Sequence, residues 1–278
     1  MILDSIKAEF LRIHALLGDL TDDRIDNDPD HIYLSHFERI NRLAAVHVAD
    51  EIAQRLLSDP ELRAAIRRIS HLKRINSLRL EIKCAESIIA DPDPWARLEQ
   101  FVYYPNYVEL ARMEYRGAKL NARDRVVFLG SGPLPLSLIC LYRRYGVEST
   151  GIEQAPEYAA LSGKLVKTLG LDGHIRIVHG NHLSLPLKGR YRLVMVGADA
   201  LPKEEIFAHL VKALSPGEMI SYRIYEKGLR RLLDDQSVFD LPPEFSECAR
   251  IRPQPPVNNT SVFAVKGLEI NESLEFAP

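Results

Sequence analysis

The spacing of apolar residues divides the chain into a helical first part and an alternating second part. Up to about residue 120, apolar residues recur every three or four positions, which is the period of an amphipathic helix. The helices that this pattern predicts cover residues 3–17, 35–57, 60–69 and 72–90. The run Asp91-Pro92-Asp93-Pro94 then ends the pattern, because proline disfavours helical conformation in the residue before it, and another helix is expected to begin near Trp95.

From Arg125 the pattern changes to short apolar runs that alternate with helical segments. The predicted strands cover residues 126–129, 148–153, 175–178, 191–196, 219–225 and 261–265. The predicted helices between them cover residues 134–145, 156–169 and 203–214. Such alternation predicts a parallel sheet with helices on both faces. The sequence therefore predicts an α/β protein with a helical N-terminal domain over residues 1–120 and a doubly wound sheet domain over residues 121–278.

Composition excludes several classes of protein. The chain has 278 residues, 46% of them hydrophobic, which is enough to bury a full core. With 36 basic and 38 acidic residues the net charge is −2, so no nucleic-acid partner is expected. The three cysteines are far apart and lack Cys-x-x-Cys spacing, which argues against a disulfide framework or a zinc site. No membrane-spanning run or export signal is recognisable, so a cytoplasmic location without membrane partners is expected.

The turn Gly130-Ser131-Gly132-Pro133-Leu134 is the first candidate for chemistry. It follows an apolar strand and precedes a helix, a context in which glycines let the backbone approach a nucleotide closely. Glu153 ends the second strand, where an acid can bind ribose hydroxyls, and Asn181 follows the third, where its side chain could address an adenine edge. Asp199 follows the fourth strand. Because ligands bind at the carboxyl ends of such strands, these segments are expected to form one crevice.

The glycine turn favours S-adenosylmethionine over a dinucleotide. It lacks the third glycine of the dinucleotide fingerprint and has proline where that helix would open. S-adenosylmethionine carries no phosphates that would need such a cradle. A dinucleotide site and an ordinary tight turn are the alternatives.

The helical part offers two further candidates. Glu81 and Glu86 flank Cys84 on one predicted helix, and the segment 101–107 places four aromatic rings around a proline. From composition alone, Glu81 is interpreted as a solvated helix acid and the tyrosines as part of a core cluster.

Four segments together resemble the nicotianamine synthases and their bacterial relatives, which make opine-type metallophores such as staphylopine and pseudopaline. The segments are Gly130 to Leu136, Tyr104-Pro105 with Tyr107, Tyr222-Arg223 with Tyr225, and Val257 to Val262. The resemblance covers residues from about 80 to 265 and is weak over the first 75. It implies that the sheet domain is Rossmann-like, of the class I S-adenosylmethionine-dependent type.

The resemblance also implies an activity. Family members transfer the 3-amino-3-carboxypropyl (aminobutanoyl) group of S-adenosylmethionine to an amine, so S-adenosylmethionine is a co-substrate and methylthioadenosine is released. The sulfonium activates all three attached carbons, so the placement of the nucleophile selects the carbon that reacts. Glu81 matches the family's catalytic glutamate and is the candidate base for the protonated amine. Tyr107 matches the family's active-site tyrosine.

Three residues are candidates for substrate binding: Tyr104, Arg223 and Asn259. A guanidinium can hold a carboxylate through two hydrogen bonds, which favours Arg223 as the partner of a substrate carboxylate. A surface salt bridge is the alternative interpretation of Arg223.

The acceptor differs within the family that the chain resembles. Nicotianamine synthases transfer repeatedly and close an azetidine ring, whereas the bacterial relatives make one transfer onto histidine and pass the product to an opine dehydrogenase. We favour one transfer onto histidine, as in the bacterial relatives, because two regions depart from the archaeal and plant members: Tyr33, His36 and Arg39 replace a more acidic character in the N-terminal region, and Gly197-Ala198-Asp199 follows the fourth strand. Nicotianamine synthesis, methyl transfer to a small molecule and a non-catalytic nucleotide-binding module are the alternatives. A functional link to an opine dehydrogenase and a homodimer are expected, and no metal held by the protein.

Overall fold

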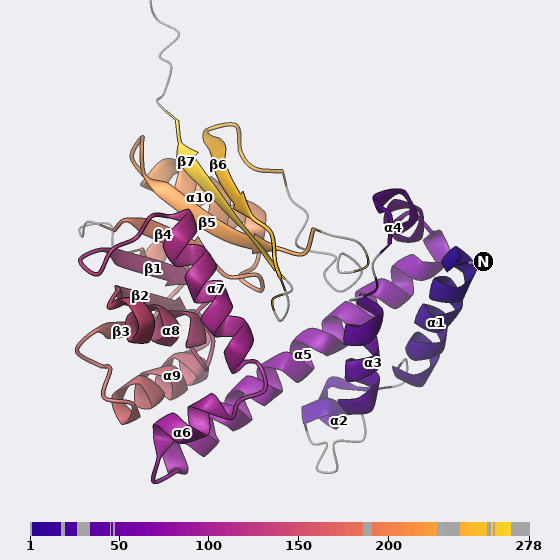
Figure 1. Cartoon of the computed structure of the whole chain (residues 1–278), viewed down its shortest axis with the longest axis horizontal. Coiled ribbons are helices and arrows are strands. Elements are labelled where there is room, and N and C mark those ends of the chain that lie inside the picture. The colour runs from indigo at the N-terminus through magenta and orange to yellow at the C-terminus, as the bar shows by residue number, and fades with distance from the viewer. Residues whose placement is uncertain are drawn as a thin grey trace, which may run out of the picture. The chain divides into compact units, whose positions relative to one another are not determined.

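The computed structural model describes most of the chain, and its residues form two compact units (Figure 1). The described residues are 2–17, 20–26, 34–44, 46, 48–185, 191–226, 229, 240–254, 257 and 259–267. Unit 1 consists of Met1–Ser87 with Ile224–Val238, and unit 2 of Ile88–Arg223 with Phe239–Pro278. The chain therefore leaves unit 1 after residue 87, builds most of unit 2, returns to unit 1 after residue 223 and enters unit 2 again after residue 238.

Unit 1 is helical. Its helices are α1 (Ile2–Leu17), α2 (Asp22–Asp26), α3 (Leu34–Ala44), α4 (Asp50–Leu57) and most of α5 (Pro60–Ala90). Their apolar faces form one core, whose most deeply buried members include Phe10, Ile13, Leu17, Ile25, Ile40, Leu56, Leu62, Ile69 and Leu72. Leu229 is fully buried in the same core, so the returning segment contributes to the packing of unit 1.

Two boundaries predicted in this region are wrong. The expected helix over residues 35–57 is divided into α3 and α4, where Ala49 has an extended backbone and the β-branched Val46 and Val48 have low helix propensity. The expected helices over 60–69 and 72–90 are one continuous helix, α5. Its residues 61–90 contain neither proline nor glycine, so the interrupted apolar pattern at Ser70 and His71 does not end the helix.

Unit 2 contains a seven-stranded sheet in the order β3-β2-β1-β4-β5-β7-β6. The strands are β1 (Arg125–Leu129), β2 (Glu148–Glu153), β3 (Ile175–His179), β4 (Leu193–Val196), β5 (Met219–Ile224), β6 (Phe245–Ile251) and β7 (Thr260–Lys266). The first five pair in parallel, and β6 pairs with β7 in antiparallel fashion. The expected α/β fold is confirmed, with six strands close to their predicted positions.

Strand β6 was missed by the sequence pattern. It lies at the edge of the sheet, and most of its side chains are exposed or half-exposed. An edge strand of this kind carries polar residues that discourage pairing with other chains, so it has no apolar run to recognise.

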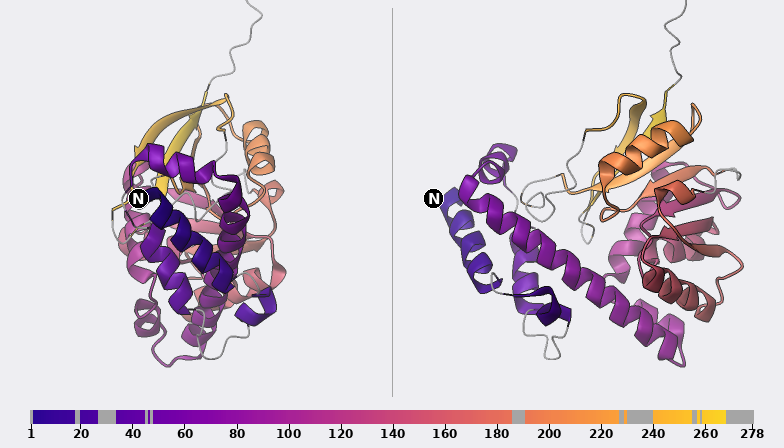
Figure 2. Two further views of the ribbon diagram at one scale, coloured as in Figure 1. Left: turned by 90° about the vertical axis from the view of Figure 1, so that its right-hand side faces the viewer. Right: turned by 180° about the vertical axis from the view of Figure 1, so that it is seen from behind.

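Helices cover both faces of this sheet. The helices of unit 2 are α6 (Pro94–Glu99), α7 (Tyr104–Gly117), α8 (Leu136–Tyr145), α9 (Pro156–Thr168) and α10 (Lys203–Ala213), with the short 3₁₀ helix η1 (His182–Ser184). On β5, the Tyr222 ring lies 5.4 Å from the ring of Phe207 in α10, whereas the next residue, Arg223, reaches α7 and α8. Successive strand residues point to opposite faces, so α10 and the pair α7 and α8 lie on opposite sides, as the two views from front and back show (Figures 1 and 2).

Helices α6 and α7 belong to the compact unit that contains the sheet. Helix α7 contacts α8, β6 and β7, and it buries Leu110, Ala111 and Met113. The division between domains at residues 120 and 121 remains a prediction. Among the residues that the structure describes, no helix is long and apolar enough to cross a membrane.

Candidate functional site

The parallel strands bring most of the predicted cofactor-binding residues to one edge of the sheet. Because β1 to β5 run in the same direction, the segments that follow them meet at the carboxyl edge. These segments are Gly130–Leu134 after β1, Glu153 at the end of β2, Asn181 after β3, Gly197–Asp199 after β4, and Arg223 near the end of β5. Open α/β sheets bind their ligands at this edge.

The glycine turn is held tightly by its neighbours. Gly130 (φ 76°) and Gly132 (φ 71°) have left-handed backbone conformations, which glycine adopts without a steric penalty. A Cβ atom on Gly130 would lie 2.9 Å from the Cβ of Ala200, and one on Gly197 would lie 3.1 Å from the carbonyl oxygen of Gly130. The turn after β1 and the loop after β4 are therefore in close backbone contact.

The amides of this turn are already used inside the protein. The amides of Gly130 and Ser131 donate to the carbonyl oxygen of Ile152 at 2.9 and 3.2 Å, and the amide of Gly132 donates to the Glu153 carboxylate at 2.9 Å. The next positions include Pro133 and Pro135, which have no N–H group, and α8 begins only at Leu136. A phosphate cradle needs free backbone amides at this place, so the arrangement is poorly suited to a dinucleotide.

The Glu153 carboxylate is hydrogen-bonded to the backbone of the glycine turn. Its two carboxylate oxygens accept hydrogen bonds from the amides of Gly132 and Ala155, at 2.9 and 3.0 Å, and the residue is 7% exposed. The carboxylate thus fixes the shape of the glycine turn. Its contact with ribose hydroxyls remains a prediction.

Asn181 caps the short helix η1. Its side-chain oxygen accepts a hydrogen bond from the amide of Leu183 at 2.9 Å, and its own amide donates to the Ser184 hydroxyl at 3.3 Å, which is a capping box. The residue is exposed at the carboxyl edge. The expected contact with an adenine edge remains a prediction.

Lys203 was not found by sequence reasoning. It is 2% exposed, and its ammonium donates to the carbonyl oxygens of Gly197, Ala198 and Ala200, the last two at 2.8 Å. A buried ammonium requires such partners, and here they are the carbonyls of the loop that packs on Gly130. A single lysine at the start of a predicted helix carries no pattern that would have indicated this role.

Arg223 and Glu114 form a buried ion pair. The Arg223 Nε donates to the Glu114 carboxylate at 3.2 Å, and its Nη1 donates to the Ser137 hydroxyl at 3.0 Å. Arg223 is 5% exposed and Glu114 is 1% exposed. The alternative interpretation of Arg223 as a surface salt bridge is therefore wrong. Its contact with a substrate carboxylate remains a prediction, with two of its three guanidinium nitrogens already engaged.

Glu114 is the second residue that sequence reasoning missed. As an acid in a charged helix it resembles a solvated residue. It lies, however, four residues after Leu110 and three after Ala111, so it is on the face of α7 that is buried. Tyr107, seven residues before it, lies on the same face. This spacing from the apolar residues could have indicated that Glu114 is buried.

The predicted tyrosines, Tyr104 and Tyr107, lie in the first turn of α7. The Tyr104 hydroxyl accepts a hydrogen bond from Arg143 at 3.1 Å, and burial raises the pKa of that hydroxyl. Arg143 also pairs with Glu99 at 2.7 Å and lies 4.4 Å from the centre of the Trp95 ring, so it connects α8 to α6 and α7. Tyr107 is half-buried and packs against the apolar cluster of Leu110, Met113 and Val257.

The remaining candidates lie in several places. Glu81 is half-buried on α5 in unit 1, and Glu86 on the same helix is exposed, so Glu81 and Tyr107 belong to different units. Asn259 is buried just before β7 in unit 2. Tyr33 and Asn258 lie outside the described residues, and Arg39 pairs with Glu9.

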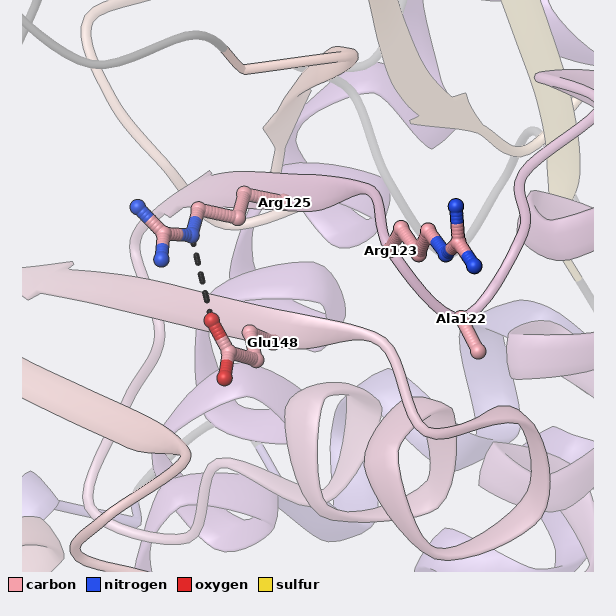
Figure 3. A pocket seen from close by; sticks show the side chains of 4 residues that line it. All are labelled: Ala122, Arg123, Arg125 and Glu148. Carbon is pink, nitrogen blue, oxygen red and sulfur yellow. Dashed lines mark hydrogen bonds and ion pairs between the residues drawn. The ribbon is translucent and has the colours of Figure 1, made fainter.

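A pocket at the opposite edge of the sheet is separate from these residues. It is lined by Ala122, Arg123, Arg125 and Glu148, where β1 and β2 begin. Arg125 donates to the Glu148 carboxylate at 3.1 Å across it (Figure 3). Within the described part of the chain, no group of three or more metal-ligating side chains was found.

The cysteines are expected to differ sharply in reactivity. Burial raises the pKa of the Cys140 thiol to about 12, whereas Cys248 is exposed. The thiolate is the nucleophile, so Cys248 should be alkylated by iodoacetamide at pH 8 in the native protein and Cys140 should not. Mapping the modified peptides by mass spectrometry measures both. Alkylation of Cys140 at the rate of Cys248 before unfolding would contradict the burial described.

Comparisons with known proteins agree with this architecture. A family model described as "Nicotianamine synthase protein" matches residues 4–271. The chain is 29% identical over 154 residues to "Nicotianamine synthase-like 5 protein" of Hordeum vulgare, a match that covers 51% of this chain and 54% of that protein. The chain thus spans about half the length of this curated relative.

Two solved structures are similar over almost the whole chain. The E81Q mutant of MtNAS in complex with S-adenosylmethionine has a TM-score of 0.84 and 27% identity, and covers 96% of this chain and 99% of its own. MtNAS in complex with MTA and tNA has the same TM-score of 0.84, 27% identity and the same coverage.

Proposed function

Because the chain belongs to the nicotianamine synthase family, we propose that it transfers the 3-amino-3-carboxypropyl group of S-adenosylmethionine to the amine of an amino acid. The observation that carries this proposal is the similarity over 96% of the chain to MtNAS, whose E81Q mutant was crystallised in complex with S-adenosylmethionine. The residues at the carboxyl edge of the sheet and the presence of Glu81 and Tyr107 support it.

The donor binds at the carboxyl edge of the parallel strands in this proposal. Gly130–Leu134 approaches the methionine part, and Glu153 and Asn181 face the nucleoside. The occupied amides of the glycine turn and its two prolines favour a ligand without phosphates, which distinguishes S-adenosylmethionine from a nicotinamide or flavin dinucleotide.

The chemistry requires a free amine. Glu81 accepts a proton from the ammonium of the acceptor, and the neutral nitrogen then attacks the terminal carbon of the aminocarboxypropyl chain. A nitrogen–carbon bond forms as the carbon–sulfur bond breaks, and the electron pair of that bond neutralises the sulfonium, which leaves as methylthioadenosine. Tyr107 orients the amine or the methionine part of the donor, and the proposed substrate contacts are Tyr104, Arg223 and Asn259. No redox step is involved.

Histidine is the proposed acceptor, with one transfer per molecule, and the product is an intermediate of an opine-type metallophore. An opine dehydrogenase would then take the product in the cytoplasm. Repeated transfer with ring closure, which would make nicotianamine, is the alternative. The family match favours it as strongly as it favours the single transfer, so the acceptor must be determined by experiment.

Incubation with S-adenosylmethionine and L-histidine, D-histidine or no acceptor tests the proposal directly. We expect methylthioadenosine together with a histidine adduct that carries one aminobutanoyl unit, identified by mass spectrometry. Nicotianamine formed without added acceptor would establish the alternative. S-adenosylhomocysteine as the nucleoside product would show methyl transfer and overturn the proposal.

A further inference from the structure

One buried polar network connects four elements of unit 2. The Arg223 guanidinium joins β5 to α7 through Glu114 and to α8 through Ser137. The same Glu114 oxygen also accepts a hydrogen bond from the Ser261 hydroxyl of β7 at 3.2 Å. The guanidinium lies 5.4 Å from the centre of the Phe128 ring on β1, which forms a further wall.

The network is not arranged for stability alone. Among the described residues, Arg223 Nη2 and Glu114 Oε2 are buried without a hydrogen-bond partner. Taking two charges out of water is costly, and unsatisfied atoms add to that cost, so apolar residues of similar volume would often stabilise such a place better. An incompletely satisfied ion pair at this place points to a role in fixing geometry.

The geometry that it fixes includes two proposed parts of the site. Tyr107 and Glu114 lie two turns apart on the same face of α7, since seven residues make almost two full turns. Ser137 is the second residue of α8 and lies three residues after Leu134, the end of the proposed donor loop. One guanidinium thus holds both the helix that carries Tyr107 and the helix that follows the donor loop.

We infer that Glu114 is a positioning residue, which acts through Arg223 to hold Tyr107 and the Gly130–Leu134 loop in a fixed relation. This inference rests on the proposed function for the identity of the reaction. Arg223 has a positioning role in this inference in addition to its proposed contact with a substrate carboxylate. Within an active site, a misplacement of about 1 Å can cost about 10²-fold in rate, so loss of the network should reduce turnover more than donor affinity.

The test compares Glu114→Gln, the double variant Glu114→Leu with Arg223→Met, and Glu109→Gln as a matched control. Glu109 lies on the same helix and pairs locally with Arg112. We expect Glu114→Gln to lower kcat by about 10²-fold, with the donor KM changed less than about threefold. The double variant should have the thermal midpoint of the wild type. Its kcat should be low, but loss of the proposed substrate contact of Arg223 would have the same effect, so support comes from Glu114→Gln and from hydrogen exchange. The control should match the wild type.

Hydrogen exchange gives a readout that does not depend on turnover. Exchange in peptides that contain residues 104–110 and 130–138 should increase in the double variant and stay unchanged in Glu109→Gln. Wild-type kcat in the double variant, or unchanged exchange in both peptides, would overturn the inference. Absence of methylthioadenosine with the wild-type protein would instead overturn the proposed function, and the exchange data would still decide the positioning role.

Discussion

Glu81→Gln is expected to lower the rate of methylthioadenosine release by about 10² to 10⁴-fold, because the amide cannot accept the proton of the acceptor ammonium. Donor affinity should be nearly unchanged, since the donor is assigned to the sheet of unit 2 and Glu81 lies on α5. The defect should also shrink as the pH rises, because a larger fraction of the amine is then free without a base. Turnover measured between pH 7 and 9, with donor affinity from calorimetry, checks both parts.

Glu86→Gln is the matched control for this experiment. Glu86 lies on the same helix, is exposed, and is five residues away, which places it on a different side of α5. It should leave turnover unchanged. Wild-type turnover in Glu81→Gln would remove Glu81 as the base, and a large loss of donor affinity would assign it to donor binding instead.

The second large effect is expected for Gly130→Ala. The backbone of Gly130 is left-handed, and the added Cβ would lie 2.9 Å from the Cβ of Ala200, on a loop that Lys203 holds in place. Strain and overpacking together should lower the free energy of unfolding by about 2–4 kcal/mol. Displacement of the turn should also weaken S-adenosylmethionine binding by about tenfold or more, equivalent to about 1.4 kcal/mol.

Gly170→Ala separates backbone strain from the contact. Gly170 has a similar φ of 70°, and an added Cβ would meet no atom within 4 Å. The free energy of unfolding of this variant should therefore fall by only about 1–2 kcal/mol, and its affinity for S-adenosylmethionine should be unchanged. Chemical denaturation and calorimetry of both variants give the comparison. Equal donor affinity in the two variants would show that the turn after β1 does not contact the donor.

The glycine turn shows how tertiary structure sharpened a weak motif. A Gly-x-Gly sequence alone is compatible with phosphate binding, with S-adenosylmethionine binding and with a plain turn. In the folded protein the amides of Gly130, Ser131 and Gly132 are bonded to Ile152 and Glu153. These internal bonds leave the three amides unable to bind a phosphate, which the sequence motif alone does not reveal.

The sequence by itself determined the fold class, because hydrophobic periodicity is a local property. It predicted six of the seven strands and the helices α8, α9 and α10 to within a few residues, and it indicated which strand ends carry polar residues. Two of the wrong predictions have a physical reason. Strand β6 lacks an apolar run because it lies at an exposed edge, and α5 continues through Ser70 because nothing in that segment breaks a helix.

Only the tertiary structure decided which polar side chains meet. Glu114 and Arg223 are 109 residues apart in the chain, and Glu114 and Ser261 are 147 apart. Lys203 shows its role only when the loop carbonyls around it are in place. Sequence periodicity records whether a residue faces the core, but the partner of a buried charge depends on strand order and helix packing. The buried network behind the proposed site could therefore not be predicted from the chain alone.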